Sequence, residues 1–237
     1  MILGAFGDSF LFGSDLSDIQ DHDSVKLFFP SQLTYPAILA KQLNLQYYCT
    51  ALPAQGNKVI ADDVIRAVSQ HKNSMLYVIN WTWIDRFEYL GRARVSDDIG
   101  WESTLPNNSN TKSTFYYKNF YSDIDAKLSN LIIINTVLEI LLVEKCKFIM
   151  TYMDNLLFDT EYNCSFSIKY LQNKIKPHMI DFENLNFLDW SRKHKYEISE
   201  NWHPLEQAHQ SAADYLLPTV NHLLHTKYPG GEINETI

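Results

Sequence analysis

The start of the chain constrains the fold more than any other stretch. A short apolar run over residues 2–6 predicts a buried strand, and Gly7-Asp8-Ser9 then interrupts it with a tight turn. If a helical turn follows, Ser9 lies at a strand-to-helix corner, where free backbone N–H groups favour negative charge on a reacting oxygen. Ser9 is therefore either a helix cap or a nucleophile, and we expect Asp8 to hold the turn with its side chain.

Strands and helices alternate along the rest of the chain, which has 237 residues and is long enough for one domain with a full core. Apolar runs predict further strands at 45–49, 75–79 and 147–152, and periodic patterns predict helices at 31–43, 57–69, 127–143 and 205–224. Residues 187–190 are either a fifth short strand or the start of a turn. This alternation predicts an α/β fold, a three-layer α/β/α sandwich with a flavodoxin-like parallel sheet of about five strands and helices on both faces.

A second group of polar residues, from Glu200 to His203, precedes Pro204 and the last predicted helix. An acid three residues before a histidine on a loop can bring its carboxylate to one imidazole nitrogen and leave the other for a hydroxyl. By itself His203 is more typical of a surface or capping histidine than of a catalytic base. In parallel sheets, however, sites lie where the strands end, and Ser9, Gly56, residues 80–83 and Asp154 all follow predicted strands.

The turn at Ser9 together with the acid-x-x-His-Pro sequence resembles the GDSL/SGNH hydrolase family. A second block of that family, which contains a glycine, is matched by residues 51–57 with Gly56. The third block, Gly-x-Asn-Asp, is loosely echoed by residues 80–83. The resemblance implies Ser9 as the nucleophile, His203 as general base and acid, and Glu200 as the residue that orients His203. The family usually has aspartate in that place, and Asp189 is the alternative acid.

The resemblance also implies an oxyanion hole made by the backbone N–H groups of Ser9 and Gly56. Its third donor in the family is an asparagine, and Thr82 occupies that slot here, with Asn80 and Asn57 as neighbours that can substitute. Losing one such donor costs about 10²–10³ in rate, so the departure matters. It leaves room for a slow or narrow enzyme, or for a protein that only binds.

These residues predict a serine esterase that removes a small acyl group, with an acylated sugar or glycan as the expected substrate. An O-acyltransferase using the same site and a non-catalytic glycan-binding or assembly module on the same scaffold are the alternatives. The resemblance implies neither a metal nor an organic cofactor. A net charge of −8 argues against nucleic acid as the main partner, and residues 131–143 form an apolar run too short to span a bilayer. We expect a cytoplasmic protein and leave the oligomeric state open.

Residues 1–225 are expected to form one domain, followed by a mobile tail over 226–237. Residues 84–125 have a looser pattern and predict an insertion above the sheet, whose aromatic side chains form either a lid, a sugar-stacking wall or plain packing. Within it, Arg86 and Glu88 either pair with each other or reach the site. The acidic stretch 15–23, which includes His22, is interpreted as a solvated loop.

Overall fold

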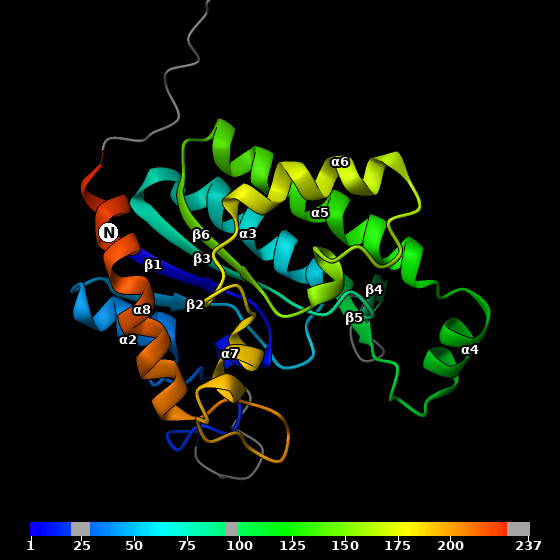
Figure 1. The fold of residues 1–237 in the computed structure, drawn as a ribbon, viewed down its shortest axis with the longest axis horizontal. Coiled ribbons are helices and arrows are strands. Elements are labelled where there is room, and N and C mark those ends of the chain that lie inside the picture. The colour runs from blue at the N-terminus through cyan, green and yellow to red at the C-terminus, as the bar shows by residue number, and fades with distance from the viewer. Residues whose placement is uncertain (20–28, 93–98, 227–237) are drawn as a thin grey trace, which may run out of the picture.

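The computed structural model describes residues 1–19, 29–92 and 99–226 (Figure 1). Residues 20–23 of the predicted acidic loop, including His22, and nearly all of the predicted tail therefore lie outside the described residues.

A parallel sheet forms the centre of the molecule, as the alternation of elements predicts. It contains β1 (Ile2–Phe6), β2 (Gln46–Cys49), β3 (Met75–Trp81) and β6 (Lys147–Tyr152), in the order β2-β1-β3-β6. Ala5 of β1 lies opposite Cys49 and Val78, so the carboxyl ends of the strands meet at one edge. Every residue of β3 is buried, as expected of a strand covered on both faces.

The described part of the chain has four strands in this sheet rather than about five. Residues 187–190, the candidate fifth strand, instead begin the helix α7 (Phe187–Lys193). The Asn186 side chain caps this helix by accepting the Asp189 N–H at 2.8 Å, and so fixes its first turn. On the edge of β6 that faces away from β3, the described residues form only an isolated bridge between Met150 and Met179.

Helices cover both faces of the sheet (Figure 1). On one face lie α2 (Tyr35–Gln42) and α8 (Glu206–His225), and on the other lie α3 (Asn57–His71), α5 (Asp123–Val143) and α6 (Phe166–Ile175). The predicted helices are confirmed, with boundaries shifted by a few residues. The shorter elements are α1 (Ser9–Phe12), α4 (Thr111–Asn119) and the 3₁₀ turns Lys72–Ser74, Asn155–Leu157 and Lys176–His178.

The longest apolar helix, α5, begins earlier than the sequence predicts, at Asp123. Its 21 residues are long and apolar enough to cross a membrane by length and composition. In the fold it packs against α3 and α6 and buries Lys127, which pairs with Asp159 at 3.1 Å. Ile132 of the same helix is half exposed. We therefore interpret α5 as a core helix of the sandwich.

The insertion at 84–125 forms a hairpin and a helix rather than irregular chain. Strands β4 (Phe87–Arg92) and β5 (Ile99–Thr104) pair antiparallel, and α4 lies beyond them at the side of the main sheet (Figure 1). Phe87 stacks on Tyr116 of α4 with ring centroids 3.8 Å apart. Some of the aromatic side chains thus pack within the insertion, whereas Phe115 and Phe120 remain exposed.

Candidate active site

Ser9 is the first residue of α1, directly after the turn that ends β1. The Asp8 side chain accepts the Phe10 N–H at 3.0 Å and so caps this short helix, as predicted. The helix is terminated by Gly13, which has a φ of +82°, a value that residues with a side chain rarely adopt. Ser9 is thereby fixed at a tight strand-to-helix corner, with 8% of its surface exposed.

His203 lies on a closed loop before α8, held by an antiparallel bridge between Ile198 and Pro204. Inside the loop, the Ser199 hydroxyl accepts the His203 N–H at 3.2 Å. Trp202, with a φ of +68°, lets the chain reverse direction within four residues. The helix begins at Glu206, so Pro204 closes the loop and is not the first helical residue.

These two loops bring Ser9 and His203 together although 194 residues separate them. The Ser9 Oγ lies 2.9 Å from Nε2 of His203, which is hydrogen-bonding distance. The imidazole packs edge-on against Phe10 with centroids 5.1 Å apart, and this contact fixes the plane of the ring. A hydroxyl and an imidazole in this relation match the arrangement in which a base activates a serine nucleophile.

The acid that contacts His203 is Asp15, not Glu200. Nδ1 of His203 lies 2.8 Å from Oδ2 of Asp15. Glu200 belongs to the same loop as His203, but its side chain is exposed. Among the described residues, the imidazole is hydrogen-bonded to Asp15 and Ser9 and not to Glu200. The predicted role of Glu200 is therefore wrong, and so is the alternative Asp189, whose carboxylate is occupied by Asn155, Asn186 and Arg192.

Asp15 is held as a carboxylate by its neighbours. Its partial burial raises the pKa, but hydrogen bonds from His203, Ser199 and Asn201 outweigh this and hold the pKa below the ordinary value of 3.8. The Ser199 hydroxyl donates at 2.6 Å and the Asn201 amide at 3.2 Å. Asp15 therefore carries a negative charge at neutral pH and favours the imidazole tautomer with its proton on Nδ1.

The sequence did not reveal Asp15 because it belongs to an acidic stretch, and no spacing to another motif distinguishes its carboxylate from the others in that stretch. Asp18, three residues later, accepts from the Ser31 hydroxyl and the Gln32 N–H and is structural. Asp15 has a φ of +71°, a value that a non-glycine residue seldom adopts. Together with Gly13, this turn directs Asp15 back toward the His203 loop, and only the tertiary fold reveals it.

The loops after β1, β2 and β3 meet at this edge, as the strand order predicts. The Asn57 amide oxygen accepts the Thr82 N–H at 2.8 Å, and the Thr82 hydroxyl donates to Asp8 at 2.7 Å. Asp154, after β6, accepts the Ile84 N–H at 3.0 Å, and burial raises the pKa of its carboxyl. These contacts join the loops of four strands into one rigid platform.

Of the two expected backbone oxyanion donors, only the Ser9 N–H has no acceptor in the described part of the chain. The Gly56 N–H donates to Oε1 of Glu88 at 2.6 Å. The other oxygen of Glu88 accepts the Val59 N–H at 3.0 Å, so this buried carboxylate caps α3 from the hairpin. Gly56 is therefore not the free donor that the sequence predicts.

The predicted side-chain donors are either committed to other acceptors or buried out of the reach of a substrate. The hydroxyl of Thr82 is bound to Asp8, and the Asn57 amide nitrogen donates to the Thr82 carbonyl and to Asn130. Asn80 is 1% exposed, and its amide oxygen accepts from Thr151 at 2.8 Å. Its amide nitrogen has no partner among the described residues but is fully buried, out of the reach of a substrate. The structure thus corrects the expectation that Thr82, Asn57 or Asn80 supplies the third donor.

Arg86 and Glu88 do not form an ion pair with each other among the residues described. Nη1 of Arg86 lies 3.1 Å from Oδ2 of Asp8 and also donates to the Gln55 carbonyl. The guanidinium covers the Trp83 ring at 5.0 Å, a cation–π contact. Arg86 therefore reaches the site, the second of the two alternatives predicted for it.

Two hollows lie near these elements. One of about 310 Å³ is lined by Trp83, Asp85, Arg86, Leu105, Pro106 and Asn107. The Trp83 ring contacts Phe10, which in turn contacts His203, so the wall of this hollow continues into the triad.

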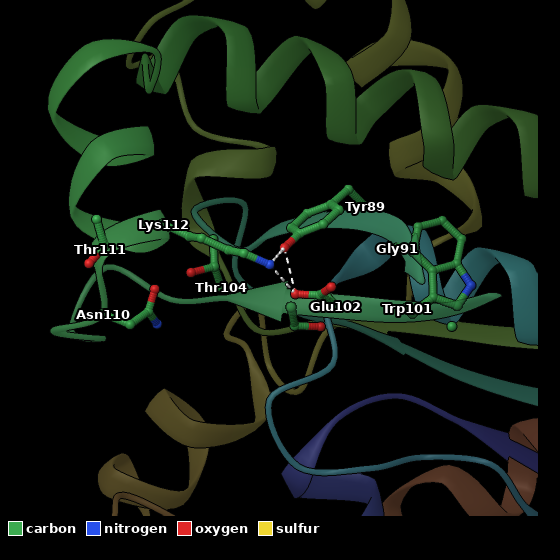
Figure 2. A pocket seen from close by; sticks show the side chains of 10 residues that line it. Tyr89, Gly91, Trp101, Glu102, Thr104, Asn110, Thr111 and Lys112 are labelled. Atoms are coloured by element: carbon green, nitrogen blue, oxygen red, sulfur yellow. Dashed lines mark hydrogen bonds and ion pairs between the residues drawn. The ribbon is translucent and has the colours of Figure 1, made fainter. Parts of the chain in front are cut away.

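The larger hollow, of about 550 Å³, lies between the hairpin and α4 (Figure 2). At its centre Lys112 contacts the Tyr89 hydroxyl and Glu102, each at 2.7 Å. None of the triad residues lines either hollow, but Trp83 of the smaller one contacts Phe10 beside His203, so the smaller hollow is the better candidate for the reacting group. Among the described residues, no cluster of histidine, cysteine and acidic side chains is placed to hold a metal ion.

Comparison with known proteins identifies the fold. No protein-family model and no curated protein sequence matches this chain. The psychrotrophic esterase EstA from Pseudoalteromonas sp., in a structure inhibited by monoethylphosphonate, is similar with a TM-score of 0.50 and 8% identity over 95% of this chain and 99% of EstA. TesA is similar with a TM-score of 0.50 and 11% identity over 94% and 99% of the two chains. A member of the lipolytic protein G-D-S-L family from Veillonella parvula has a TM-score of 0.49 and 10% identity, with coverage of 92% and 97%. The chain has the GDSL/SGNH hydrolase fold, as its motifs predict.

Proposed function

We propose that this chain is a serine esterase in which Ser9 is the nucleophile, His203 the general base and acid, and Asp15 the residue that orients His203. The observation that carries the proposal is the continuous chain of contacts from Ser9 Oγ through both nitrogens of His203 to Asp15. A glycan-binding module needs no such relay. The fold by itself does not fix an activity, so the proposal rests on this site.

The reaction proceeds in two halves. Nε2 of His203 accepts the proton of Ser9 as Oγ forms a bond to the ester carbonyl carbon, and then returns that proton to the departing alkoxide. The acyl-enzyme on Ser9 is cleaved by a water molecule that His203 activates in the same way. Asp15 remains ionised throughout and stabilises the imidazolium, because its pKa is held below the usual range.

For the substrate we propose a small acyl ester on a sugar or glycan. The hollow of about 310 Å³ is at the lower end of ligand pockets in volume. An aromatic ring at Trp83 beside the polar groups of Asp85 and Asn107 matches the apolar face and hydroxyl rim of a sugar ring.

The test is hydrolysis of p-nitrophenyl acetate and of acetylated monosaccharides by the wild type and by Ser9→Ala, with labelling by a serine-directed fluorophosphonate. We expect turnover and labelling in the wild type, and neither in Ser9→Ala. Circular dichroism establishes that the variant is folded. Labelling that persists in Ser9→Ala, or a folded wild type that neither turns over nor labels, would refute the assignment.

A further inference from the structure

The oxyanion of an ester hydrolase needs more than one donor, and this site lacks its expected set. Gly56 gives its N–H to Glu88, and Thr82 gives its hydroxyl to Asp8. Moreover, both acceptors are buried carboxylates, which oppose negative charge on a nearby reacting oxygen. The proposed esterase therefore requires a donor that its sequence motifs do not reveal.

Arg86 lies where the loops that build such a hole converge. Nη1 contacts Asp8, the residue before the nucleophile, and the Gln55 carbonyl, the residue before Gly56. A Cβ added to Gly56 would lie 3.1 Å from the Cβ of Arg86, so the Arg86 side chain starts directly over the glycine. Thr82 shares the same carboxylate oxygen of Asp8. The guanidinium is thus fixed by all three loops.

Part of the guanidinium remains unused. The side chain of Arg86 is 10% exposed, and its hydrogen bonds to described residues all involve Nη1. Nε and Nη2 carry three further N–H donors. Neither nitrogen is among the fully buried unpaired atoms of the described residues, so both are open to a ligand. The same side chain lines the hollow of about 310 Å³ beside Trp83. A substrate atom in that hollow supplies the acceptor that the protein does not.

We infer that Arg86 is a catalytic residue whose free N–H donors, with the N–H of Ser9, stabilise the oxyanion of the tetrahedral intermediate. This inference rests on the proposed esterase function and adds to it the donor that replaces Gly56 and Thr82. Asp8 anchors one nitrogen of the guanidinium and leaves the other edge to the substrate. The carboxylates of Asp8 and Glu88 bring two negative charges to this place and oppose a third on the oxyanion. A positively charged donor offsets that repulsion.

The test compares Arg86→Lys and Arg86→Gln with the wild type on p-nitrophenyl acetate. Lysine keeps the ion pair with Asp8, and so the fold, but lacks the planar fork with donors on two edges. We expect kcat to fall about 10²–10³-fold in Arg86→Gln and by a smaller factor in Arg86→Lys, with KM changed less than about threefold. Adding methylguanidinium to Arg86→Ala should restore part of kcat, which a purely structural role would not allow.

Thr82→Val is the matched control, because it removes the other side-chain donor to Asp8 and leaves Arg86 in place. If Arg86 acts only by positioning Asp8, Thr82→Val and Arg86→Gln lower kcat by the same factor, and the inference is overturned. It is also overturned if folded Arg86→Gln retains more than a tenth of the wild-type kcat. A wild type that neither turns over nor labels with fluorophosphonate refutes the proposed function itself, and the role of Arg86 with it.

Discussion

Exchanging Asp15 for asparagine tests the unexpected part of the triad. The exchange preserves the size of the side chain but replaces one acceptor oxygen with an N–H₂ group. If that group faces Nδ1 of His203, which is now 2.8 Å from a carboxylate oxygen, Nδ1 becomes the acceptor. The imidazole proton then moves to Nε2, the nitrogen 2.9 Å from Ser9 Oγ, and His203 no longer acts as a base.

The size of the effect follows from this tautomer change. In the serine-protease triad the same exchange lowers kcat about 10⁴-fold. The Asp15 side chain is 28% exposed, so water can partly replace its contact with His203. We therefore expect kcat/KM for p-nitrophenyl acetate to fall about 10²–10³-fold, or about 2.7–4 kcal/mol of transition-state stabilisation.

Glu200→Gln is the matched control, because it also exchanges a carboxylate for an amide next to His203 in the sequence. Its side chain is exposed, and we expect kcat/KM to change less than about twofold. Thermal melts followed by circular dichroism show whether each variant is folded. The reasoning fails if Asp15→Asn keeps more than a tenth of the wild-type kcat/KM, or if Glu200→Gln loses as much activity as Asp15→Asn.

Two further predictions concern stability. In Gly56→Ala the new Cβ would lie 2.7 Å from Cδ of Glu88 and displace the cap of α3, so we expect a loss of about 1–3 kcal/mol in urea denaturation; an unchanged midpoint would contradict this. Buried His209 accepts the Tyr35 N–H through Nδ1 at 3.1 Å, and burial lowers its pKa to about 3. Because the unfolded state binds this proton near pH 6.5, stability is fully present above that pH and falls as the pH drops toward 3, by up to about 1.4 kcal/mol per pH unit. His209→Asn, which keeps an acceptor for Tyr35, should reduce this slope in urea titrations, and an identical slope would show that another group is responsible.

Local signals were sufficient to predict where Ser9 and His203 lie in the fold, but their roles as nucleophile and base came from the family resemblance. Ser9 follows a strand and a Gly-Asp pair, and His203 precedes a proline before a strongly periodic helix, so each position is set by neighbours in sequence. The strands and helices of the sandwich were predictable for the same reason. Residues 187–190 were ambiguous because a four-residue apolar run fits a strand or a helix. The signal that decides it is Asn186, whose side chain caps the helix at Asp189.

The hairpin and the oxyanion donors were not predictable, because their chemistry depends on contacts between distant residues. Glu88 is a charged residue at a buried position of β4, and charge in the middle of a strand argues against burial. It is stable there because it receives the N–H groups of Gly56 and Val59 and the hydroxyl of Ser103. No pattern within residues 84–92 indicates that these donors exist.

The position of the acid changes how the site is assembled. When the acid and the histidine belong to the same loop, the contact between them needs no other part of the chain. Here Asp15 belongs to the loop of the nucleophile, and Ser199, Asn201 and His203 all bind it from the other end of the chain. The contact that orients the imidazole is therefore also the contact that docks the His203 loop beside Ser9. Base, acid and nucleophile are therefore aligned by one set of contacts between the two ends of the chain.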